Sequence, residues 1–598
     1  MGFIKYIGLG LFIIALSIFT LSLGLDHYQL TAENISADTD YHREAILEAA
    51  KGNGMLDKEY ATNFAFIADF KKTLLSAQET LDRQAQANIP EGVDEWNFRL
   101  GEWKFKDYTL LTTKHSSTGP VADHPFLFWL LTIGLGILGG LLFILPDLQN
   151  IPGIKNNRIY HHTMTRGLKL GWRGVFLVTV IVGLLSYGVF YMGKSLFYPA
   201  LTLLVVGLIT GLVFFYERSI NNTPARSAGP ENWTAWLGIF TGIYLIGFYL
   251  LLYWAPEYIT SWIVLSDPLS YLLNGGEASR WFVYGMLYTV IVLTMGLRML
   301  VKYRHNMYQV VRTTSVMFFQ TAFAFLIPEI LIRLNQPYFD FKNIWPLDYD
   351  FFFKNELNIL IDNGGIGIFM LVWGILLIIV GVPLFTYFFG KRWYCSWVCG
   401  CGGLAETLGD PYRQLSDKSL RAWKFERWII HGVLVFAVVM TILVLYTYFT
   451  GSYTVLGFNS DTVRTWYGFI IGSAFAGVVG TGFYPLMGNR VWCRFGCPLA
   501  AYLGLVQRFK SRFRITTNGG QCISCGNCST YCEMGIDVRH YAQRGQDVVR
   551  SSCVGCGICA AVCPRGVLRL ENSSEDVDSR TEQIRTIMIS EDEVRLLS

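Results

Sequence analysis

Charge is scarce in this sequence of 598 residues: 16% of them are Asp, Glu, Lys or Arg, whereas 52% are hydrophobic. A soluble protein of this length carries a far larger charged fraction. The mean hydropathy is +0.35, and several apolar stretches reach about 20 residues, which is enough to cross a bilayer. The composition excludes an ordinary soluble protein and predicts a polytopic protein whose main surroundings are lipid.

Several motifs are missing as well. No basic patch with interleaved aromatic residues is present, which argues against a nucleic-acid partner. No nucleotide or flavin motif is visible in residues 26–125, and no Cys-x-x-Cys-His run occurs anywhere in the chain, so a c-type haem is not expected. The basic run QRFKSRFR at 507–514 follows an apolar segment and is typical of a cytoplasmic flank at the membrane surface.

The apolar segments predict a mainly α-helical membrane protein with about ten transmembrane helices. The first segment has no small-x-small cleavage site, so residues 1–25 are interpreted as an uncleaved membrane anchor. The expected spans are 4–25, 126–146, 174–193, 197–216, 234–255, 281–300, 314–334, 367–390, 429–450 and 467–487.

Charges in the loops predict the orientation of these helices. Loop 147–173 carries five Lys and Arg residues and loop 298–313 carries four, whereas loops 256–280 and 335–366 are mainly acidic. Basic loops stay in the cytoplasm, so we expect both termini on the cytoplasmic side of a bacterial inner membrane. All 13 cysteines then lie at the cytoplasmic side, where thiols stay reduced, which argues against disulfides.

Residues 26–125 contain no cysteine and are expected outside the cytoplasm. Apolar residues at helical spacing predict a helix over 57–88, and an earlier helix is expected over 40–51, ending at GNG. We interpret this region as a small helical hairpin that packs on itself or on the outer loops. The alternative is a docking surface for a periplasmic partner.

The strongest motif lies near the C-terminus, where the pattern C-x2-C-x2-C-x3-C occurs twice. This spacing is typical of bacterial ferredoxins with two 4Fe–4S clusters, in which the fourth cysteine of each run binds the other cluster. It predicts an α+β ferredoxin domain over 516–571; two zinc sites are the alternative. The chain departs from the pattern at Glu533, where proline is usual, and carries an insert over 533–552. The expected ligands are Cys522, Cys525, Cys528 and Cys563 for the first cluster, and Cys553, Cys556, Cys559 and Cys532 for the second.

Two further cysteine pairs follow apolar segments. Cys395 and Cys399 come after the eighth predicted span, and Cys493 and Cys497 come after the tenth. Residues four apart lie on one face of a helix, and the predicted topology brings both pairs to one membrane depth. The pattern predicts a shared metal centre or third cluster, with Cys401 as a spare or substitute ligand. The alternative is that these cysteines are inert packing residues.

Other polar residues in the apolar segments suggest weaker sites. Glu329 could accept a proton and Gln320 could donate a hydrogen bond in a quinol site, with Arg333 nearby. A local ion pair between Glu329 and Arg333 is the alternative. The aromatic loop 337–353 is interpreted as an interfacial belt rather than a cofactor site.

These motifs together resemble the membrane-bound 4Fe–4S polyferredoxin family. Its members accompany periplasmic nitrate and nitrous-oxide reductases, and related members assist the assembly of haem-copper oxidases. The resemblance covers about 367–571, where CRFGCPLAA matches the family well. CSWVCGCGG departs from it, because Gly400 replaces proline and Cys401 replaces an aromatic residue. The first 366 residues match no family that we can name.

The expected function is electron transfer between a cytoplasmic redox partner and the quinone pool or a membrane or periplasmic partner. The alternatives are an assembly factor that reduces a metal such as copper for an oxidase, and a redox-sensing scaffold. The sequence does not give the direction of electron flow. The expected regions are an anchor at 1–25, an extracytoplasmic domain at 26–125, membrane helices at 126–390, a cytoplasmic loop at 391–428, helices with the second cysteine motif at 429–515, the ferredoxin at 516–571 and a tail at 572–598.

Overall fold

The computed structural model describes residues 2–87, 95–149, 152–153, 233–451, 454–455, 457–518, 521–572, 586–589 and 594–597. Within this part of the chain, six segments are long and apolar enough to cross a membrane, which confirms a helical membrane protein. The predicted spans 174–193 and 197–216 lie outside the described residues. The six segments are Phe3–Gly24, Pro125–Gln149, Arg280–Tyr303, Met307–Arg333, Gly364–Phe389 and Leu420–Thr450.

Two of these helices begin earlier than the sequence predicted, at Met307 and Leu420 rather than at 314 and 429. Asn306 and Ser419 cap them, because each side-chain oxygen accepts a hydrogen bond from a backbone N–H in the first turn. The extra turns are polar, so the apolar pattern did not include them. The elements are α1 (Gly2–Leu21), η1 (Ser22–Gly24), α7 (Pro125–Trp129), η2 (Leu130–Gly134), α8 (Leu135–Ile144), η3 (Leu145–Gln149), α14 (Arg280–Tyr303), α15 (Met307–Phe318), η6 (Phe319–Leu326), α16 (Ile327–Arg333), α18 (Gly364–Leu376), η7 (Leu377–Gly381), α19 (Val382–Phe389) and α22 (Leu420–Thr450).

The predicted spans 234–255 and 467–487 are also helical, although neither is among the six. The first coincides with α11 (Trp233–Trp254). The second begins earlier, as α23 (Ser460–Tyr467), and continues as a π-helix, η9 (Gly468–Val479), and α24 (Gly480–Gly482). The predicted number of about ten transmembrane helices therefore stays a prediction. Shorter elements connect the helices: η5 (Pro256–Ile259), α12 (Thr260–Val264), α13 (Asp267–Leu273), α17 (Lys354–Asp362), η8 (Asp410–Leu415), β4 (Thr454–Val455), β5 (Phe458–Asn459) and α25 (Tyr484–Met487).

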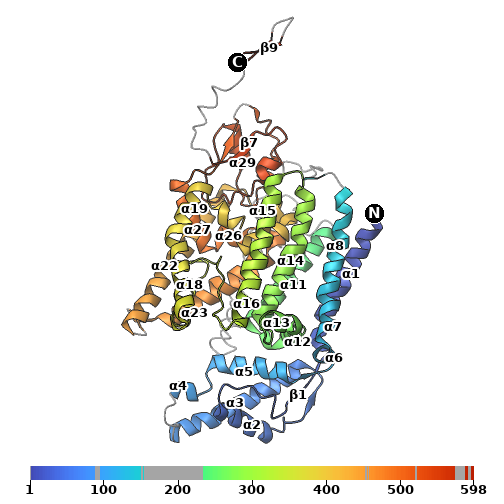
Figure 1. Ribbon diagram of the computed structural model, residues 1–598, viewed down its shortest axis with the longest axis vertical. Coiled ribbons are helices and arrows are strands. Elements are labelled where there is room, and N and C mark those ends of the chain that lie inside the picture. The colour runs from blue at the N-terminus through green and yellow to red at the C-terminus, as the bar shows by residue number, and fades with distance from the viewer. Residues whose placement is uncertain are drawn as a thin grey trace, which may run out of the picture.

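Figure 1 shows a helix bundle with a small domain at each end. The ferredoxin region lies at the same end as the start of α1, and the domain of residues 27–118 lies at the opposite end. This arrangement agrees with the predicted placement of the two domains on different sides of a membrane. Helices α1 and α8 pack closely, because a Cβ atom on Gly8 or Gly139 would lie within 2.7 Å of the other helix's backbone.

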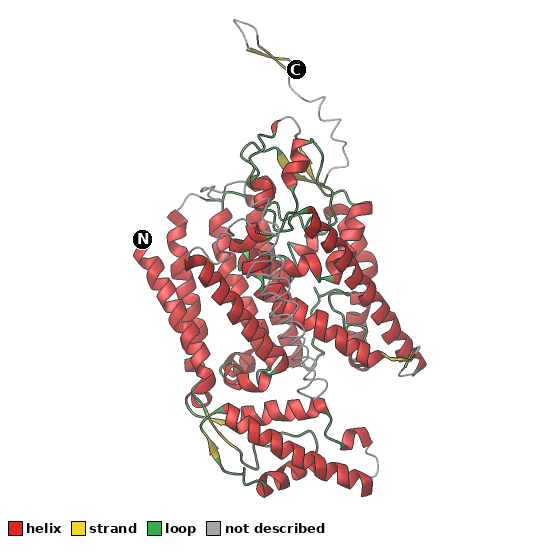
Figure 2. Cartoon of the chain, turned by 180° about the vertical axis from the view of Figure 1, so that it is seen from behind, coloured by secondary structure: helices red, strands yellow, loops and turns green. Residues whose placement is uncertain are grey.

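The N-terminal domain is more than the predicted helical hairpin. Its helices are α2 (Asp40–Gly52), α3 (Asn63–Ala87), α4 (Glu95–Phe98) and α5 (Glu102–His115), and α6 (Pro120–Asp123) leads to the bundle. A three-stranded antiparallel sheet in the order β2-β1-β3 completes it (Figure 2). The predicted helix 57–88 starts only at Asn63, because Glu59 and Tyr60 pair with β1 instead. The strands are β1 (His27–Gln29), β2 (Glu59–Tyr60) and β3 (Ser117–Thr118).

The ferredoxin region is a two-stranded antiparallel ribbon with three short helices. The insert that sequence analysis noted at 533–552 carries the middle helix, α29. One hydrophobic core contains cysteines of this region and also Cys395, Cys399, Cys493 and Cys497, so the ferredoxin and the bundle are packed as one body. The elements are β6 (Arg514–Thr517), α28 (Asn527–Thr530), α29 (Val538–Gln543), α30 (Ile558–Ala561) and β7 (Leu568–Glu571), followed by β8 (Thr586–Ile589) and β9 (Val594–Leu597).

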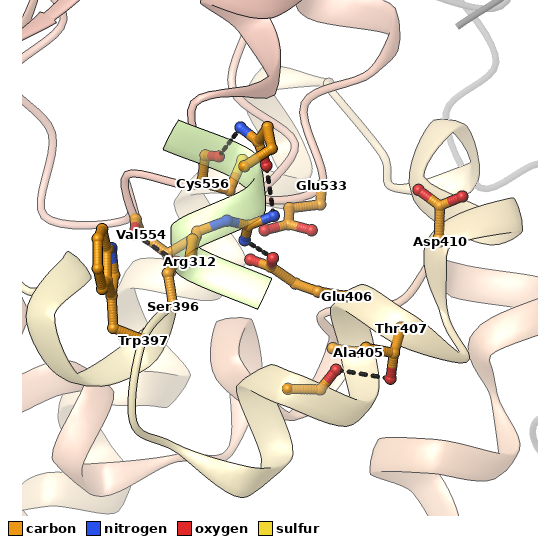
Figure 3. Close-up of polar contacts among 12 residues, drawn as sticks. Arg312, Ser396, Trp397, Ala405, Glu406, Thr407, Asp410, Glu533, Val554 and Cys556 are labelled. Carbon is orange, nitrogen blue, oxygen red and sulfur yellow. Dashed lines mark hydrogen bonds and ion pairs between the residues drawn. The ribbon is translucent and has the colours of Figure 1, made fainter. Parts of the chain in front are cut away.

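A buried ion network joins the ferredoxin to the bundle. Figure 3 shows the part of it around Arg312, Glu406 and Glu533. At its centre is Glu533, whose carboxylate lies 2.6 Å from the Arg413 guanidinium and 3.0 Å from that of Arg490. Burial would raise the pKa of Glu533, but the two arginines outweigh it and lower this pKa to about 2. Glu406 of the bundle pairs with both Arg490 and Arg312. The glutamate that replaces the usual proline therefore supplies the charge that anchors the domain.

The arrangement predicts opposite accessibility for the two ends of the molecule. In intact cells, a cysteine in place of the exposed Glu33 should react with a membrane-impermeant thiol reagent. A cysteine in place of the exposed Arg421 should react only after the membrane is permeabilised. The unsubstituted protein gives the background from its own thiols. Labelling of the Arg421→Cys protein in intact cells would reverse the predicted orientation.

The ion network predicts a large cost for removing the charge of Glu533. Glu533→Gln leaves two buried guanidinium groups short of a partner, and breaking a buried pair in this way costs about 3–5 kcal/mol. We expect a clear fall in the midpoint of thermal unfolding of the detergent-solubilised protein. Glu44→Gln, at an exposed position, is the matched control and should leave the midpoint unchanged. Equal midpoints for the two variants would contradict the role of the network.

Candidate functional site

The first four cysteines assigned by spacing come together in the structure. Cys522, Cys525, Cys528 and Cys563 line one cavity of about 360 Å³, which we call the distal ferredoxin site. The chain turns sharply between the first three, with a positive φ of 58° at Ser524 and 78° at Gly526. Burial, together with the neighbouring Cys525 and Cys563, raises the pKa of Cys528 to about 12. Arg539 and Arg565 are among the other residues that line this cavity.

The other four ferredoxin cysteines line a second cavity of about 360 Å³, which we call the proximal ferredoxin site. Its ligands would be Cys532, Cys553, Cys556 and Cys559. Burial, followed by the neighbouring Cys556, Cys553 and Cys532, raises the pKa of Cys559 well above its usual value. The structure therefore reproduces both quartets, including the exchange of the fourth cysteine between the two runs.

Side chains of the bundle hold the loop around the proximal site. Four consecutive carbonyl groups, from Cys553 to Cys556, each accept a hydrogen bond from a different bundle side chain, at 2.7 to 3.0 Å. Because the donors come from separate parts of the chain, the loop has one fixed position against the bundle. The donors are Gln507 to Cys553, Ser396 to Val554, Tyr308 to Gly555 and Gln309 to Cys556.

The remaining five cysteines line a third cavity of about 260 Å³ in the bundle. This membrane-domain site contains Cys395, Cys399, Cys401, Cys493 and Cys497. The prediction that the two C-x3-C pairs would meet is thus supported by their placement, but the reason given for it is wrong. Neither pair lies on one helix face: Cys395 ends α20 (Arg392–Cys395) and Cys399 caps α21 (Gly400–Thr407), while Cys493 lies in α26 (Val491–Phe495) and Cys497 caps α27 (Pro498–Lys510).

The two motifs share one backbone design. A glycine with positive φ, Gly390 or Gly488, ends the preceding helix and starts the short helix that holds the first cysteine. The amide of the second cysteine then bonds the carbonyl five residues earlier, Tyr394 for Cys399 and Trp492 for Cys497, at 2.8 and 2.9 Å. The two C-x3-C motifs therefore position their cysteines with the same backbone arrangement.

The glycines of CGCGG allow close packing around this site. A Cβ atom on Gly402 would lie 2.0 Å from the Cys395 carbonyl oxygen, and one on Gly403 would lie 2.3 Å from Val316. A hydrogen bond from Cys401 is the largest influence on the pKa of Cys399 and lowers it. Cys401 therefore supports Cys399, and the equivalence of the two motifs favours Cys399 as the ligand.

The donor sets fit clusters better than single metal ions. A tetrahedral zinc site with Zn–S bonds of about 2.3 Å needs sulfur atoms about 3.8 Å apart. Among the described residues, no group of three or more Cys, His, Asp or Glu side chains converges in the way that a single ion requires. Each quartet instead surrounds a cavity, and thiolates are the ligands of iron–sulfur clusters.

Cationic side chains surround the membrane-domain site. Arg490 lies within 3.2 Å of the Cys395 carbonyl oxygen and 3.7 Å of the Cys493 sulfur. Lys391 is also buried and interacts electrostatically with Cys395. Positive charge of this kind stabilises thiolates in a site with little water.

Two short bridges connect the membrane-domain site with the proximal ferredoxin site. Ser396, directly after Cys395, donates a 2.7 Å hydrogen bond to the carbonyl of Val554, directly after Cys553. Arg490, which contacts Cys493, pairs at 3.0 Å with Glu533, directly after Cys532. Each bridge thus joins neighbours of the cysteines in the two cavities.

The residues of the predicted quinol site do not meet. Glu329 accepts a 2.7 Å hydrogen bond from Asn274, and Arg333 donates to the carbonyl of Leu272 instead of pairing with Glu329. Gln320 is nine residues earlier on the same helical segment, about 13 Å away along its axis. Its side-chain oxygen lies beside Gly400, at the edge of the membrane-domain site.

The interpretation of the aromatic loop 337–353 as an interfacial belt stays a prediction, although part of the loop is buried in the bundle. Ile344 in this loop is 3% exposed and packs in the same core as Cys395 and Cys399. Neither this burial nor the bundle side chains that hold the proximal loop could be predicted from the motifs, because these neighbours are remote along the chain. Ser396 is the exception, since it lies inside the first C-x3-C motif.

Comparison with known proteins agrees with these cavities. Residues 521–568 match the model of the 4Fe–4S dicluster domain, and 371–423 and 468–516 each match that of a 4Fe–4S binding domain. No solved structure matches the chain.

Two curated proteins are similar over part of their length. One, from Escherichia coli strain K12, carries the provisional name of electron transport protein YccM; it is 28% identical over 160 residues, which are 25% of this chain and 43% of that protein. The other, from Methylobacillus flagellatus, is named methylamine utilization ferredoxin-type protein MauN; it is 26% identical over 153 residues, 25% of this chain and 50% of that protein. The chain thus spans half or less of the length of these relatives. The matched domains, the apolar helices and these relatives support the resemblance drawn from the motifs: the chain carries 4Fe–4S domains and is similar to membrane polyferredoxins.

Proposed function

We propose that this protein carries single electrons between a cytoplasmic redox partner and a partner in or across the membrane, through three cysteine-held centres in series. An iron–sulfur role is supported by the matched domains and by the names of both relatives. The third centre, the partners and the placement in a bacterial inner membrane with both termini in the cytoplasm are our inference. When bound, 4Fe–4S clusters supply one-electron oxidation and reduction.

The observation that carries the proposal is the pair of bridges between the proximal ferredoxin site and the membrane-domain site. The shorter one runs from Cys553 through Val554 and the Ser396 hydroxyl to Cys395, with a single hydrogen bond of 2.7 Å between the two chain segments. The four carbonyl contacts keep that loop in place. The chain therefore holds two thiolate sites close together without requiring the ferredoxin to move.

The distal ferredoxin site is the side from which a soluble partner can approach. Ile523, next to Cys522, is 56% exposed, and Pro564 and Arg565, which follow Cys563, are also exposed. Cys553 and Cys559 of the proximal site are buried instead. The expected order is thus a soluble partner, the distal site, the proximal site and the membrane-domain site. The onward partner would be a quinone or a membrane protein.

The series of centres predicts the metal content. Four irons in each of three centres give about 12 per chain in the purified protein. Cys395→Ser combined with Cys493→Ser removes one ligand from each motif, so iron should fall to about eight while the ferredoxin signals in electron paramagnetic resonance persist. Cys401→Ser is the control and should retain all the iron, because this residue supports Cys399. An unchanged metal content in the double variant would show that these cysteines are packing residues.

The bridge through Ser396 predicts a kinetic effect without loss of metal. Ser396→Ala removes the hydrogen bond to Val554, so transfer between the proximal and membrane-domain centres should slow after rapid reduction of the ferredoxin, followed by freeze-quench spectroscopy. Ser396→Thr keeps the hydroxyl and is the matched control. Equal rates in the two variants, with full iron in both, would exclude this bridge as the connection.

A further inference from the structure

A charged loop reaches the membrane-domain site from the end of the bundle opposite to the ferredoxin. It connects α16, which ends at Arg333, to α17, which begins at Lys354. Trp345 in this loop donates a 3.0 Å hydrogen bond to the hydroxyl of Thr441 in α22. Thr441 lies nine residues before Thr450, the last residue of α22, which is about 13 Å along the helix axis. Irregular backbone at such a depth is stable in a membrane protein only where protein surrounds it or where it lines a cavity. The loop is therefore a re-entrant segment, which we define as residues 334–353.

The tip of this re-entrant segment packs in the same hydrophobic core as the membrane-domain site. Ile344 is buried in the core that contains all four cysteines of the two C-x3-C motifs, and Leu347 packs against that core. Trp373 fixes the preceding turn by donating a 3.0 Å hydrogen bond to the carbonyl of Phe341. Packing on one side and a hydrogen bond on the other thus hold the tip in this core.

The segment brings one buried cation to this position. The Lys342 side chain is 10% exposed, and its ammonium lies 3.1 Å from the carboxylate of Asp340. The same carboxylate accepts a 3.1 Å hydrogen bond from the backbone N–H of Lys342, which fixes the pair. The carboxylate of Asp340 offsets the cost of burying this ammonium, so the side chain stays charged.

Lys342 completes a set of cations around the site. Lys391 and Arg490 directly precede α20 and α26, on the side of the site where the ferredoxin docks. Lys342 belongs to the re-entrant segment and interacts electrostatically with Cys399 and Cys401. Tyr394, which is buried, lines the same cavity as the five cysteines. A charge at this point acts on whatever the cysteines hold, because low-dielectric surroundings screen it little.

We propose that Lys342, fixed by Asp340, is a positioning residue that sets the reduction potential of the centre in the membrane-domain site. Reduction adds one electron to that centre, and a nearby cation stabilises the more negative, reduced form. The lysine therefore favours reduction, while Asp340 both holds the lysine and moderates its charge. This inference rests on the proposed function, because it requires a redox centre between the two cysteine motifs.

The test is a redox titration of the purified full-length protein, followed by electron paramagnetic resonance. Lys342→Met should make reduction harder by about tenfold in the equilibrium constant, a shift of about −59 mV for one electron. Asp340→Asn should shift the potential in the opposite direction, because it leaves the lysine charge without its counter-charge. Lys342→Arg keeps the cation and should restore the potential to near that of the unsubstituted protein.

The two opposite shifts separate an electrostatic role from a structural one, since simple loosening of the site would move both potentials in one direction. Iron is measured in every variant. If the Lys342→Met protein loses the centre, the Asp340→Asn protein alone tests the inference. The inference requires that a neutral residue at position 340 raises the reduction potential of the centre. Unchanged potentials in proteins that retain the centre would overturn this inference and leave the electron-transfer proposal intact. Absence of the third centre from the unsubstituted protein would instead overturn the proposed function.

Discussion

The relation between the cysteine cavities depends on the buried guanidinium of Arg490. Its partners come from separate parts of the chain: the carbonyl of Cys395, the sulfur of Cys493, the carboxylate of Glu406 and that of Glu533. A charge that is 1% exposed is tolerated only when such partners are all in place. The requirement therefore fixes the two cysteine motifs relative to one another and both relative to the ferredoxin. The main contribution of such a buried ion network is to specify one geometry, whereas its net contribution to the free energy of unfolding is small.

The two halves of the cysteine-bearing bundle show how one local design can serve different surroundings. Both use a glycine turn, a short helix and a cysteine cap to present a pair of thiols. In the second half, Pro498 follows the cap, as is common at the first position of a helix. In the first half, Gly400 takes that position, and the side-chain oxygen of Gln320 lies beside it.

The sequence was informative where the spacing of residues alone determines the structure. The two ferredoxin quartets follow from the C-x2-C-x2-C-x3-C pattern, and the apolar stretches locate the described helices to within a few residues, except where a polar first turn is capped, as at Ser419. The sequence was also sufficient to predict that the two C-x3-C motifs meet. The argument that each pair lies on one helix face was wrong, because a helix ends between Cys395 and Cys399. What could not be predicted depends on neighbours that are remote along the chain. The strand pairing of Tyr60, the docking of Glu533 and the insertion of Ile344 beside the cysteines are of this kind.

The shared core of the bundle and the ferredoxin constrains the order in which the protein can mature. Cys395 and Cys497 are 5% and 6% exposed once the ferredoxin is docked, and the loop around Cys553 covers the site from its side. A prosthetic group of several atoms cannot pass such a closed surface without separating the two domains. The ferredoxin is also the last of these parts to leave the ribosome. If the proposed third centre is present, it would therefore have to be loaded between insertion of the final helices and closure of the C-terminal domain.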